Sequence, residues 1–142
     1  MTGAEDARLS RFSIAVRVYW EDTDAQGVVY YANYFRFMER ARSEWLRARG
    51  VGQAELAAEQ GLVFSVVDTG LRFHRPARHD DLLDISAELT ELRGARFRFV
   101  QEIRRGGPEG ELLCTGHCDA ACIDATTFKP RRLPRDLFGD PE

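Results

Sequence analysis

The chain carries a single lysine, Lys129, and almost no net charge. Its 142 residues include 20 basic and 23 acidic side chains, which gives a formal net charge of -3. The phosphates of a nucleic acid, or of an anionic membrane surface, therefore meet no overall positive field. We expect no nucleic acid partner, although the arginines that supply the positive charge can still form local basic clusters.

Long apolar runs are also missing from the sequence. No stretch approaches the roughly 20 apolar residues that a membrane-spanning helix needs. The first residues, MTGAEDARLSRF, are polar and acidic, unlike a secretory signal. We therefore expect a cytoplasmic protein without a membrane span, in which residues 1–10 form a loose leader.

Cysteine and histidine are scarce, with three of each. Cys114, Cys118 and Cys122 are spaced by four in a segment that we interpret as a strand, where four residues span about 13 Å. That distance is too long for a disulfide and for neighbouring ligands of one zinc ion. We expect reduced core cysteines on one strand face and no metal. The histidines are scattered and are interpreted as structural or surface residues: His74, His79 and His117.

The spacing of apolar residues predicts a single domain, residues 1–142, in which a strand and two helices precede four further strands. Apolar and polar side chains alternate along 12–20, as in a half-buried strand. The period becomes helical from about Ala32 to Arg49, and Gly50 ends the helix. The other expected elements are a helix at 53–60 and strands at 62–75, 82–92, 95–105 and 111–125.

Local signals refine these elements. Asn33 is a candidate cap for the long helix, and Gly70 marks a bulge or bend in its strand. Arg93 and Gly94 form a tight hairpin turn. The proline-punctuated tail after residue 125 is expected on the surface or against a partner.

The order of elements predicts an α+β fold. Strands joined mostly by hairpins form an antiparallel sheet, and the broad apolar face of the long helix needs that sheet to cover it. A sheet of about five strands leaves open edges, which favour pairing with a second copy. We therefore expect a homo-oligomer.

The segment EDTDAQGVVYYANYF connects the first strand to the long helix. Asp24 lies in this connection, and Gly27 permits an unusual backbone conformation. The N–H groups at the start of the helix can hold a carbonyl oxygen as it becomes an oxyanion. A nearby carboxylate can attack that carbonyl or deprotonate a water that does. The alternative is a solvated acidic turn, and we interpret Glu21 and Asp22 as turn and cap residues or as partners of an arginine.

The stretch RVYWEDTDAQGVVYYANYFRFMERARSEWL resembles the signature of the 4-hydroxybenzoyl-CoA thioesterase family, and is most similar to the Tol–Pal-associated acyl-CoA thioesterases of bacteria. A second stretch, FHRPARHDDLLDI, also looks like the family pattern. The resemblance covers roughly residues 12–134. It implies the hotdog fold, in which an antiparallel sheet wraps a long helix and two protomers join their sheets edge to edge.

The same resemblance implies roles for two residues. Asp24 matches the catalytic aspartate, as general base or nucleophile, and the backbone N–H of Tyr31 matches the oxyanion donor. Tol–Pal-associated members commonly carry His where this chain has Tyr31, whereas hydroxybenzoyl-type members can carry Tyr. A backbone donor is unaffected by this difference, but a histidine side chain has no counterpart here.

A coenzyme A substrate brings phosphates and an acyl chain that need binding residues. Arg78 is the candidate phosphate ligand in the PARHDD loop, and Tyr30 and Tyr34 are candidates for lining an acyl channel. The alternative for the tyrosines, and for Phe35 and Met38, is the core beneath the sheet. Further arginines could bind phosphate or instead pair with Glu88 or Glu102 on the sheet surface: Arg96, Arg98, Arg131 and Arg132.

These features predict an acyl-CoA thioesterase that hydrolyses a short-chain or aromatic acyl-CoA, as a homodimer or homotetramer. Coenzyme A is then part of substrate and product, and no cofactor is expected. One rival is a hotdog dehydratase, which needs a histidine that the EDTDAQGVVYYANYF segment lacks. The other is a non-catalytic acyl-CoA-binding module or an envelope-complex partner.

Overall fold

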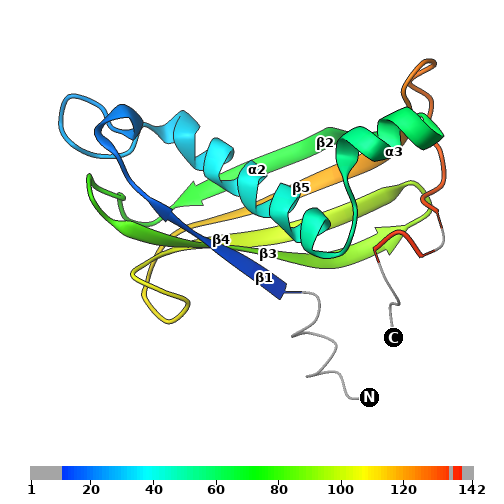
Figure 1. The fold of residues 1–142 in the computed structure, drawn as a ribbon. Coiled ribbons are helices and arrows are strands. Elements are labelled where there is room, and N and C mark those ends of the chain that lie inside the picture. The colour runs from blue at the N-terminus through cyan, green and yellow to red at the C-terminus, as the bar shows by residue number, and fades with distance from the viewer. Residues whose placement is uncertain (1–10, 135, 139–142) are drawn as a thin grey trace.

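The computed structural model describes residues 11–134 and 136–138, so the expected leader at 1–10 lies outside the described residues. Five antiparallel strands form one sheet in the order β1-β3-β4-β5-β2, and the long helix α2 lies along one face (Figure 1). This confirms the predicted α+β class. The strands are β1 Arg11–Arg17, β2 Leu62–Phe73, β3 Leu82–Arg93, β4 Arg96–Arg105 and β5 Glu111–Asp124; the helices are η1 Trp20–Asp22, α2 Tyr31–Ala48 and α3 Gln53–Gln60.

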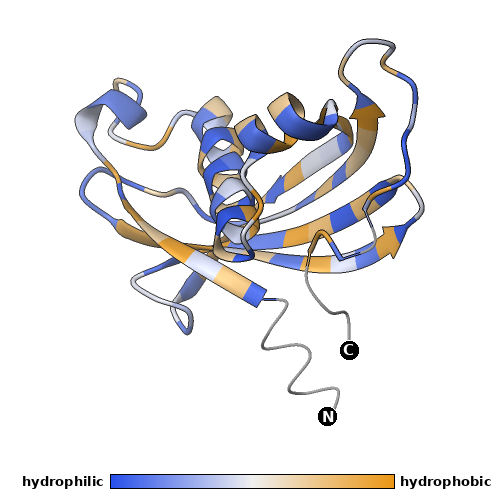
Figure 2. Cartoon of the chain, turned by 45° about the vertical axis from the view of Figure 1, so that its right-hand side comes forward, coloured by the Kyte–Doolittle hydropathy of each residue, from blue (hydrophilic) through white to orange (hydrophobic). Residues whose placement is uncertain are grey.

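Side-chain alternation explains why these strands form a sheet with one covered face. Hydrophobic and hydrophilic residues alternate along the strands (Figure 2), and the apolar residues on one face of β4, including Phe97, Phe99 and Ile103, are buried. Gln101 shares this face. Its amide donates to the carbonyls of Met38 (3.0 Å) and Ser86 (3.2 Å), so the buried polar group is satisfied and ties α2 to the sheet.

Trp45 is the largest side chain between α2 and the sheet, and only 1% of its surface is exposed. Its ring packs edge-on against Phe99, with centroids 5.0 Å apart, and against Phe138, at 5.6 Å. Phe138 comes from the tail, and Leu133 and Leu137 pack beside the core as well. The tail therefore completes the core of its own chain, and its expected place on the surface or against a partner is wrong for these residues.

Replacing Trp45 with Ala should lower the free energy of unfolding by about 3–5 kcal/mol, because a buried indole leaves a cavity that the rigid sheet cannot fill. Urea denaturation followed by far-UV circular dichroism measures the change. The control is Phe128→Ala, which changes an exposed side chain. Its free energy of unfolding should lie within about 0.5 kcal/mol of the wild-type value. Equal stabilities for all three proteins would show that Trp45 is not a core residue.

Several predicted details are corrected by the structure. β1 ends at Arg17, three residues early, because the chain turns into η1. The bulge in β2 falls between Val66 and Asp68 rather than at Gly70. Gly70 instead faces His117, whose Cε1 would lie 3.0 Å from a Cβ at that position. A glycine here therefore makes room for the neighbouring imidazole.

The three cysteines lie on β5, and all are free and buried, as predicted. Burial raises the pKa of each thiol, and that of Cys114 to about 12. Because the thiolate is the reactive form, the folded protein should give almost no reaction with a thiol reagent at pH 8, whereas the denatured chain should react at all three cysteines. Fast labelling of the native protein would contradict the buried placement.

The two ends of the sheet are β1 and β2, as expected for an open sheet. β2 is the longer edge, and Val66 and Val67 on it are 53% and 46% exposed. An exposed apolar edge of this length favours pairing with another strand. Among the described residues, no helix has the length and apolar character to cross a membrane.

Candidate active site

Asp24 occupies a tight turn between η1 and α2. Its backbone N–H donates to the carbonyl of Val28 (2.9 Å), and Gly27 closes the turn with a φ of +80°, a conformation that favours glycine. The carboxylate Oδ1 accepts hydrogen bonds from the N–H groups of Gln26 (2.8 Å) and Val28 (3.4 Å). Oδ2 accepts none from any described residue, so one oxygen orients the carboxylate while the other is free to react.

Asp22 connects this turn to the helix. It is buried, and its Oδ2 accepts a hydrogen bond from the N–H of Tyr19 (2.9 Å). Its carbonyl accepts from the N–H of Tyr30 (3.1 Å) and from the side-chain amide of Asn33 (2.9 Å). Asp22 is therefore the turn residue that the sequence indicated. Asn33 lies inside the first turn of α2 and binds the preceding loop, so its predicted role as a cap is wrong.

The start of α2 presents unpaired backbone donors. Tyr30 precedes the helix in an extended conformation, and no side chain caps it. The N–H groups of Tyr31 and Ala32 point out of the first turn, where an α-helix has no internal acceptor, and they find no acceptor among the described residues. A negatively charged oxygen is stabilised at such a terminus. Because Asp22 directly precedes this turn and binds Tyr30 and Asn33, it ties the turn of Asp24 to the start of the helix.

The tyrosines of this segment fall into two groups. Tyr30 and Tyr31 are 49% and 59% exposed, and their rings lie 4.8 Å apart; a side-chain hydrogen bond to Tyr31 raises the pKa of Tyr30. Tyr34 is buried, its hydroxyl accepts a hydrogen bond from the N–H of Ala77 (3.0 Å), and burial raises its pKa. Tyr34 thus anchors a loop and packs in the core, which favours the core alternative over a place in an acyl channel.

The loop between β2 and β3 lies against the Asp24 turn. Val28 and Arg78 form a β-bridge, and the N–H of His79 donates to the carbonyl of Gly27 (3.1 Å). Arg78 is exposed beside the turn, as a phosphate-binding residue would need to be, and none of its contacts within the described chain engages the guanidinium. Sequence reasoning proposed Arg78 but did not predict that its loop is paired with the catalytic candidate.

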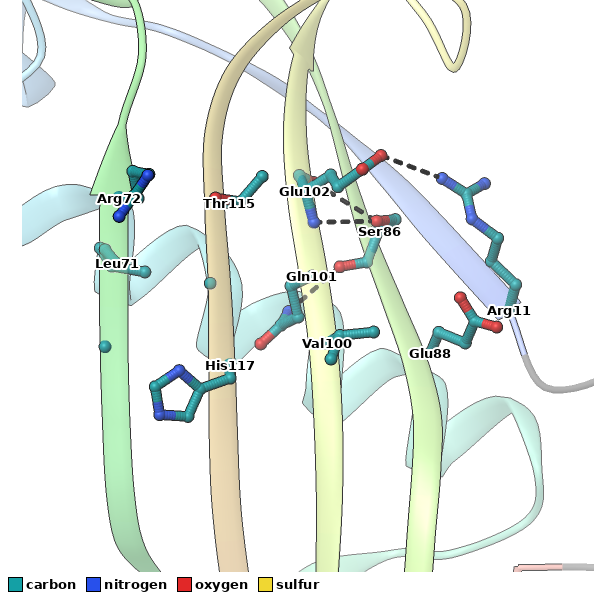
Figure 3. Close-up of a pocket in the computed structure, with 12 residues that line it drawn as sticks. Arg11, Leu71, Arg72, Ser86, Glu88, Val100, Gln101, Glu102, Thr115 and His117 are labelled. Atoms are coloured by element: carbon teal, nitrogen blue, oxygen red, sulfur yellow. Dashed lines mark hydrogen bonds and ion pairs between the residues drawn. The ribbon is translucent and has the colours of Figure 1, made fainter.

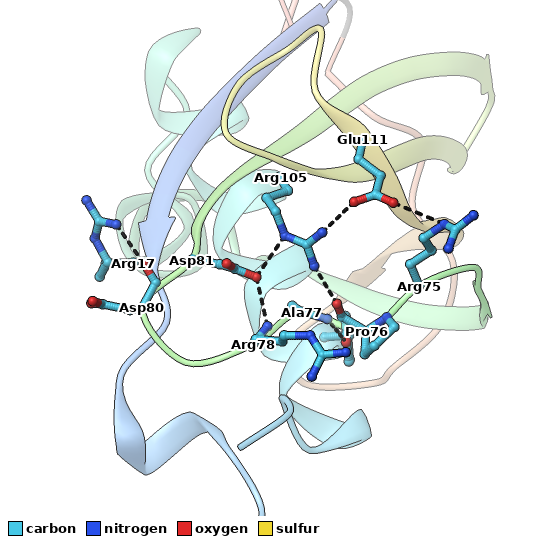
Figure 4. A network of polar contacts seen from close by, with 10 residues as sticks. Arg17, Arg75, Pro76, Ala77, Arg78, Asp80, Asp81, Arg105 and Glu111 are labelled. Atoms are coloured by element: carbon cyan, nitrogen blue, oxygen red, sulfur yellow. Dashed lines mark hydrogen bonds and ion pairs between the residues drawn. The ribbon is translucent and has the colours of Figure 1, made fainter. Parts of the chain in front are cut away.

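An ion-pair network holds this loop in place (Figure 4). Arg105 of β4 binds the Asp81 carboxylate (3.0 Å), the carbonyl of Pro76 (2.7 Å) and the carboxylate of Glu111. The same carboxylate oxygen of Asp81 also accepts a hydrogen bond from the N–H of Arg78, at 2.8 Å. The network fixes the backbone of the loop and leaves the side chain of Arg78 free to bind.

In a single protomer the candidate site is an open surface. Asp24, Tyr30 and Tyr31 are all exposed, so the carboxylate and the helix terminus are not enclosed in a pocket formed by one chain alone. The thioester of a substrate placed here would meet solvent on one side. Either the site is incomplete without a second chain, or the acidic turn is only a solvated turn.

A hollow of about 620 Å³ lies instead over the sheet face that α2 does not cover (Figure 3). Arg11 and Glu102 form an ion pair across it at 3.8 Å, and His117 stands at its rim. This hollow contains no residue of the Asp24 turn, and its paired charges and hydroxyls offer no nucleophile next to an oxyanion donor. It is not the catalytic candidate.

One side-chain cluster on this sheet was missed by sequence reasoning. The ligand atoms of Asp68, His117 and Asp119 lie within 4.8 Å of one another, because β2 and β5 pair side by side. His117 Nε2 lies 2.8 Å from Asp68, and Arg98 binds Asp119 at 3.4 Å. Arg98 therefore pairs with Asp119, not with Glu88 or Glu102 as expected. These contacts already pair the members of the cluster with one another and with Arg98.

Comparison with known proteins shows what this chain is similar to. The model of the thioesterase-like superfamily matches residues 18–138. The acyl-CoA thioester hydrolase YbgC of Escherichia coli O6:H1 is 42% identical over 129 residues, which cover 91% of this chain and 94% of that protein.

Two solved structures agree with this match. A probable thioesterase from Bartonella henselae is 41% identical, with a TM-score of 0.79 over 87% of this chain and 99% of the other. A 1,4-dihydroxy-2-naphthoyl-CoA thioesterase from Synechocystis is 25% identical, with a TM-score of 0.81 over 88% and 90%. The architecture and these matches together confirm the hotdog fold and the predicted resemblance, and the chain belongs to the thioesterase-like superfamily.

Proposed function

We propose that the protein is an acyl-CoA thioesterase, which adds water across a thioester to give a carboxylic acid and free coenzyme A. The observation that carries the proposal is that a free Asp24 Oδ2 and an unpaired N–H of Tyr31 occur on two segments tied together through Asp22. The relatives support it, because the YbgC proteins are named as acyl-CoA thioester hydrolases or thioesterases.

The site can carry the reaction with its own groups. The carbonyl oxygen of the thioester is held at the Tyr31 N–H, where negative charge is stabilised as the tetrahedral intermediate forms. Asp24 Oδ2 either removes a proton from the attacking water or attacks the carbonyl carbon itself and is released by water. In both cases the C–S bond breaks and the thiolate leaves. A thiolate is a good leaving group, so no metal or serine is required.

The surroundings suggest the substrate class. The exposed rings of Tyr30 and Tyr31 suit a short or aromatic acyl group, and Arg78 suits a coenzyme A phosphate. Coenzyme A is substrate and product here, not a cofactor. Three buried, unpaired cysteines fit a reducing compartment, which supports a cytoplasmic location.

The open site is best explained by a homodimer formed through β2. α2 runs antiparallel to β2, since Tyr34 contacts Phe73 near one end and Leu46 lines a hollow with Val66 near the other. If two β2 strands pair antiparallel about a two-fold axis, the two long helices lie side by side in opposite directions. The start of each α2 then meets the C-terminal half of the other.

The C-terminal half of α2 borders a hollow suited to an acyl group. It measures about 200 Å³ and lies between α2 and the β2 edge, with Ser43, Leu46 and Gln53 among its lining residues. In the proposed dimer each such hollow faces the other protomer's Asp24 turn. The partner would thus exclude water from the thioester, and each dimer would contain two equivalent sites.

A non-catalytic acyl-CoA-binding module is the second candidate, and the exposure of Asp24 in the single chain favours it. Release of thiol from a panel of short-chain and aromatic acyl-CoA substrates separates the two functions. Turnover that depends on Asp24 supports the enzyme. Binding of acyl-CoA with only background thiol release would establish the module instead.

A further inference from the structure

Trp20 is an unusually exposed tryptophan. Its side chain is 68% exposed, although a large aromatic ring gains much from burial. One of its faces stacks on the imidazole of His79, with centroids 3.5 Å apart and planes at 11°. The two residues are far apart in sequence, so this flat platform exists only in the folded chain.

The two residues of the platform help to line a shallow hollow. It has a volume of about 380 Å³ and is lined by Val18, Tyr19, Trp20, Glu21, His79 and Asp80. Two of these lining residues, Glu21 and Asp80, are acidic, and the exposed Arg17 donates to the carbonyl of Asp80 (2.7 Å). An aromatic floor with hydrogen-bond acceptors and a cation at its edge suits a flat heterocycle that carries an amino group and a phosphate.

Backbone hydrogen bonds hold both halves of the platform rigidly. The carbonyl of Trp20 accepts from the N–H (3.1 Å) and the hydroxyl (2.9 Å) of Thr23. The N–H of Asp80 donates to the carbonyl of Val18 (2.9 Å), and that of His79 donates to Gly27. Binding of a ligand that stacks here therefore carries only a small conformational-entropy cost for the protein.

The same bonds place the platform next to the candidate active site. Gly27 closes the turn that carries Asp24, and Arg78 precedes His79 in the loop. Arg78, beside His79 in the loop and bridged to Val28 of the Asp24 turn, is a basic residue near both. Acyl-CoA has this layout, because a phosphorylated adenine nucleotide is joined to the thioester by a flexible arm.

We propose that the Trp20–His79 platform binds the adenine ring of coenzyme A by stacking. The adenine lies on the exposed face of Trp20, its amino group donates to a carboxylate at the rim, and the phosphates lie towards Arg17 and Arg78. This inference rests on the proposed thioesterase function. It goes further by assigning a nucleotide subsite to two residues outside the catalytic turn.

The kinetic test compares two substrates that differ only in the nucleotide. Trp20→Ala should raise KM for an acyl-CoA about tenfold, since loss of base stacking typically weakens binding by this order. It should leave kcat unchanged and leave kcat/KM for the matching S-acyl-pantetheine unchanged. Trp20→Phe keeps a ring and should restore most of the affinity, whereas Phe128→Ala, at another exposed ring, should behave as wild type.

Equal effects of Trp20→Ala on both substrates would overturn the proposal, because stacking on adenine cannot affect a substrate without adenine. An unchanged KM for acyl-CoA would overturn it as well.

A binding experiment separates this proposal from the proposed function. The chain has two tryptophans, and Trp45 is 1% exposed, so quenching of tryptophan fluorescence by adenosine 3′,5′-bisphosphate should report on Trp20. Quenching that saturates and disappears in Trp20→Phe supports the platform, even if no acyl-CoA is hydrolysed. Hydrolysis without any such quenching would reject the platform and leave the thioesterase intact.

Discussion

Replacing Asp24 with Asn should lower kcat for acyl-CoA hydrolysis by about 10²–10⁴-fold, the usual contribution of a positioned acid or base. Asparagine has almost the same shape, and its side-chain oxygen can still accept from the N–H groups of Gln26 and Val28. The turn should therefore keep its conformation while the negative charge at Oδ2 is lost. Thiol release at saturating substrate measures kcat, and KM should change much less.

The control for this variant is Asp136→Asn, which makes the same chemical change at an exposed aspartate of the tail. It should retain full activity. Both variants should keep the wild-type melting temperature within about 2 °C. If Asp24→Asn retains more than about a tenth of the wild-type kcat while folded, Asp24 is not the general base or nucleophile and the catalytic assignment is wrong.

Placing a lysine at position 67 should split the proposed dimer and remove most of the activity. Val67 lies near the middle of β2, so in an antiparallel pair about a two-fold axis it would lie close to its own copy. Two lysines there repel each other, and charged edge strands resist pairing. Light scattering coupled to size exclusion should then give a mass near the 16.2 kDa of one chain instead of a multiple of it.

Activity should fall together with the mass, since each Asp24 would lose the partner surface that excludes water from the thioester. Ala15→Lys is the matched control, because Ala15 is exposed on β1 at the other edge of the sheet. It should leave mass and turnover unchanged. A fully active Val67→Lys monomer would show that one chain forms the whole site, and an unchanged mass would show that β2 is not the interface.

The predictability of the fold follows from local periodicity. Alternation of apolar and polar residues along β3 and β4 indicates which face is buried, and Gly50 and Gly61 mark where the helices end, with φ values of +83° and +67°. Gly70 was misinterpreted because its reason is not local. It faces His117, which lies on another strand 47 residues away. Phe138 was missed for the same reason, since nothing near it in sequence shows that it packs against Trp45.

The candidate site was predictable only in part. The motif around Asp24 and the helix start at Tyr31 are close in sequence, so one continuous stretch predicted both the acidic turn and the helix N-terminus. The two alternatives for Tyr34 could not be separated from the sequence, because its hydroxyl binds Ala77, in a loop that the motif does not contain. The stacking of Trp20 on His79 gave no sequence signal at all, because single aromatic and histidine residues occur in many loops.

The sequence by itself determined the order and type of the elements, the acidic turn before the long helix, and the family resemblance, because each depends on residues that are neighbours along the chain. The tertiary structure decided which loops meet at Asp24, which strand edge stays open, and that one protomer leaves the site exposed. These features arise from contacts between segments that are far apart in sequence. Their energies depend on three-dimensional packing, which no local pattern encodes.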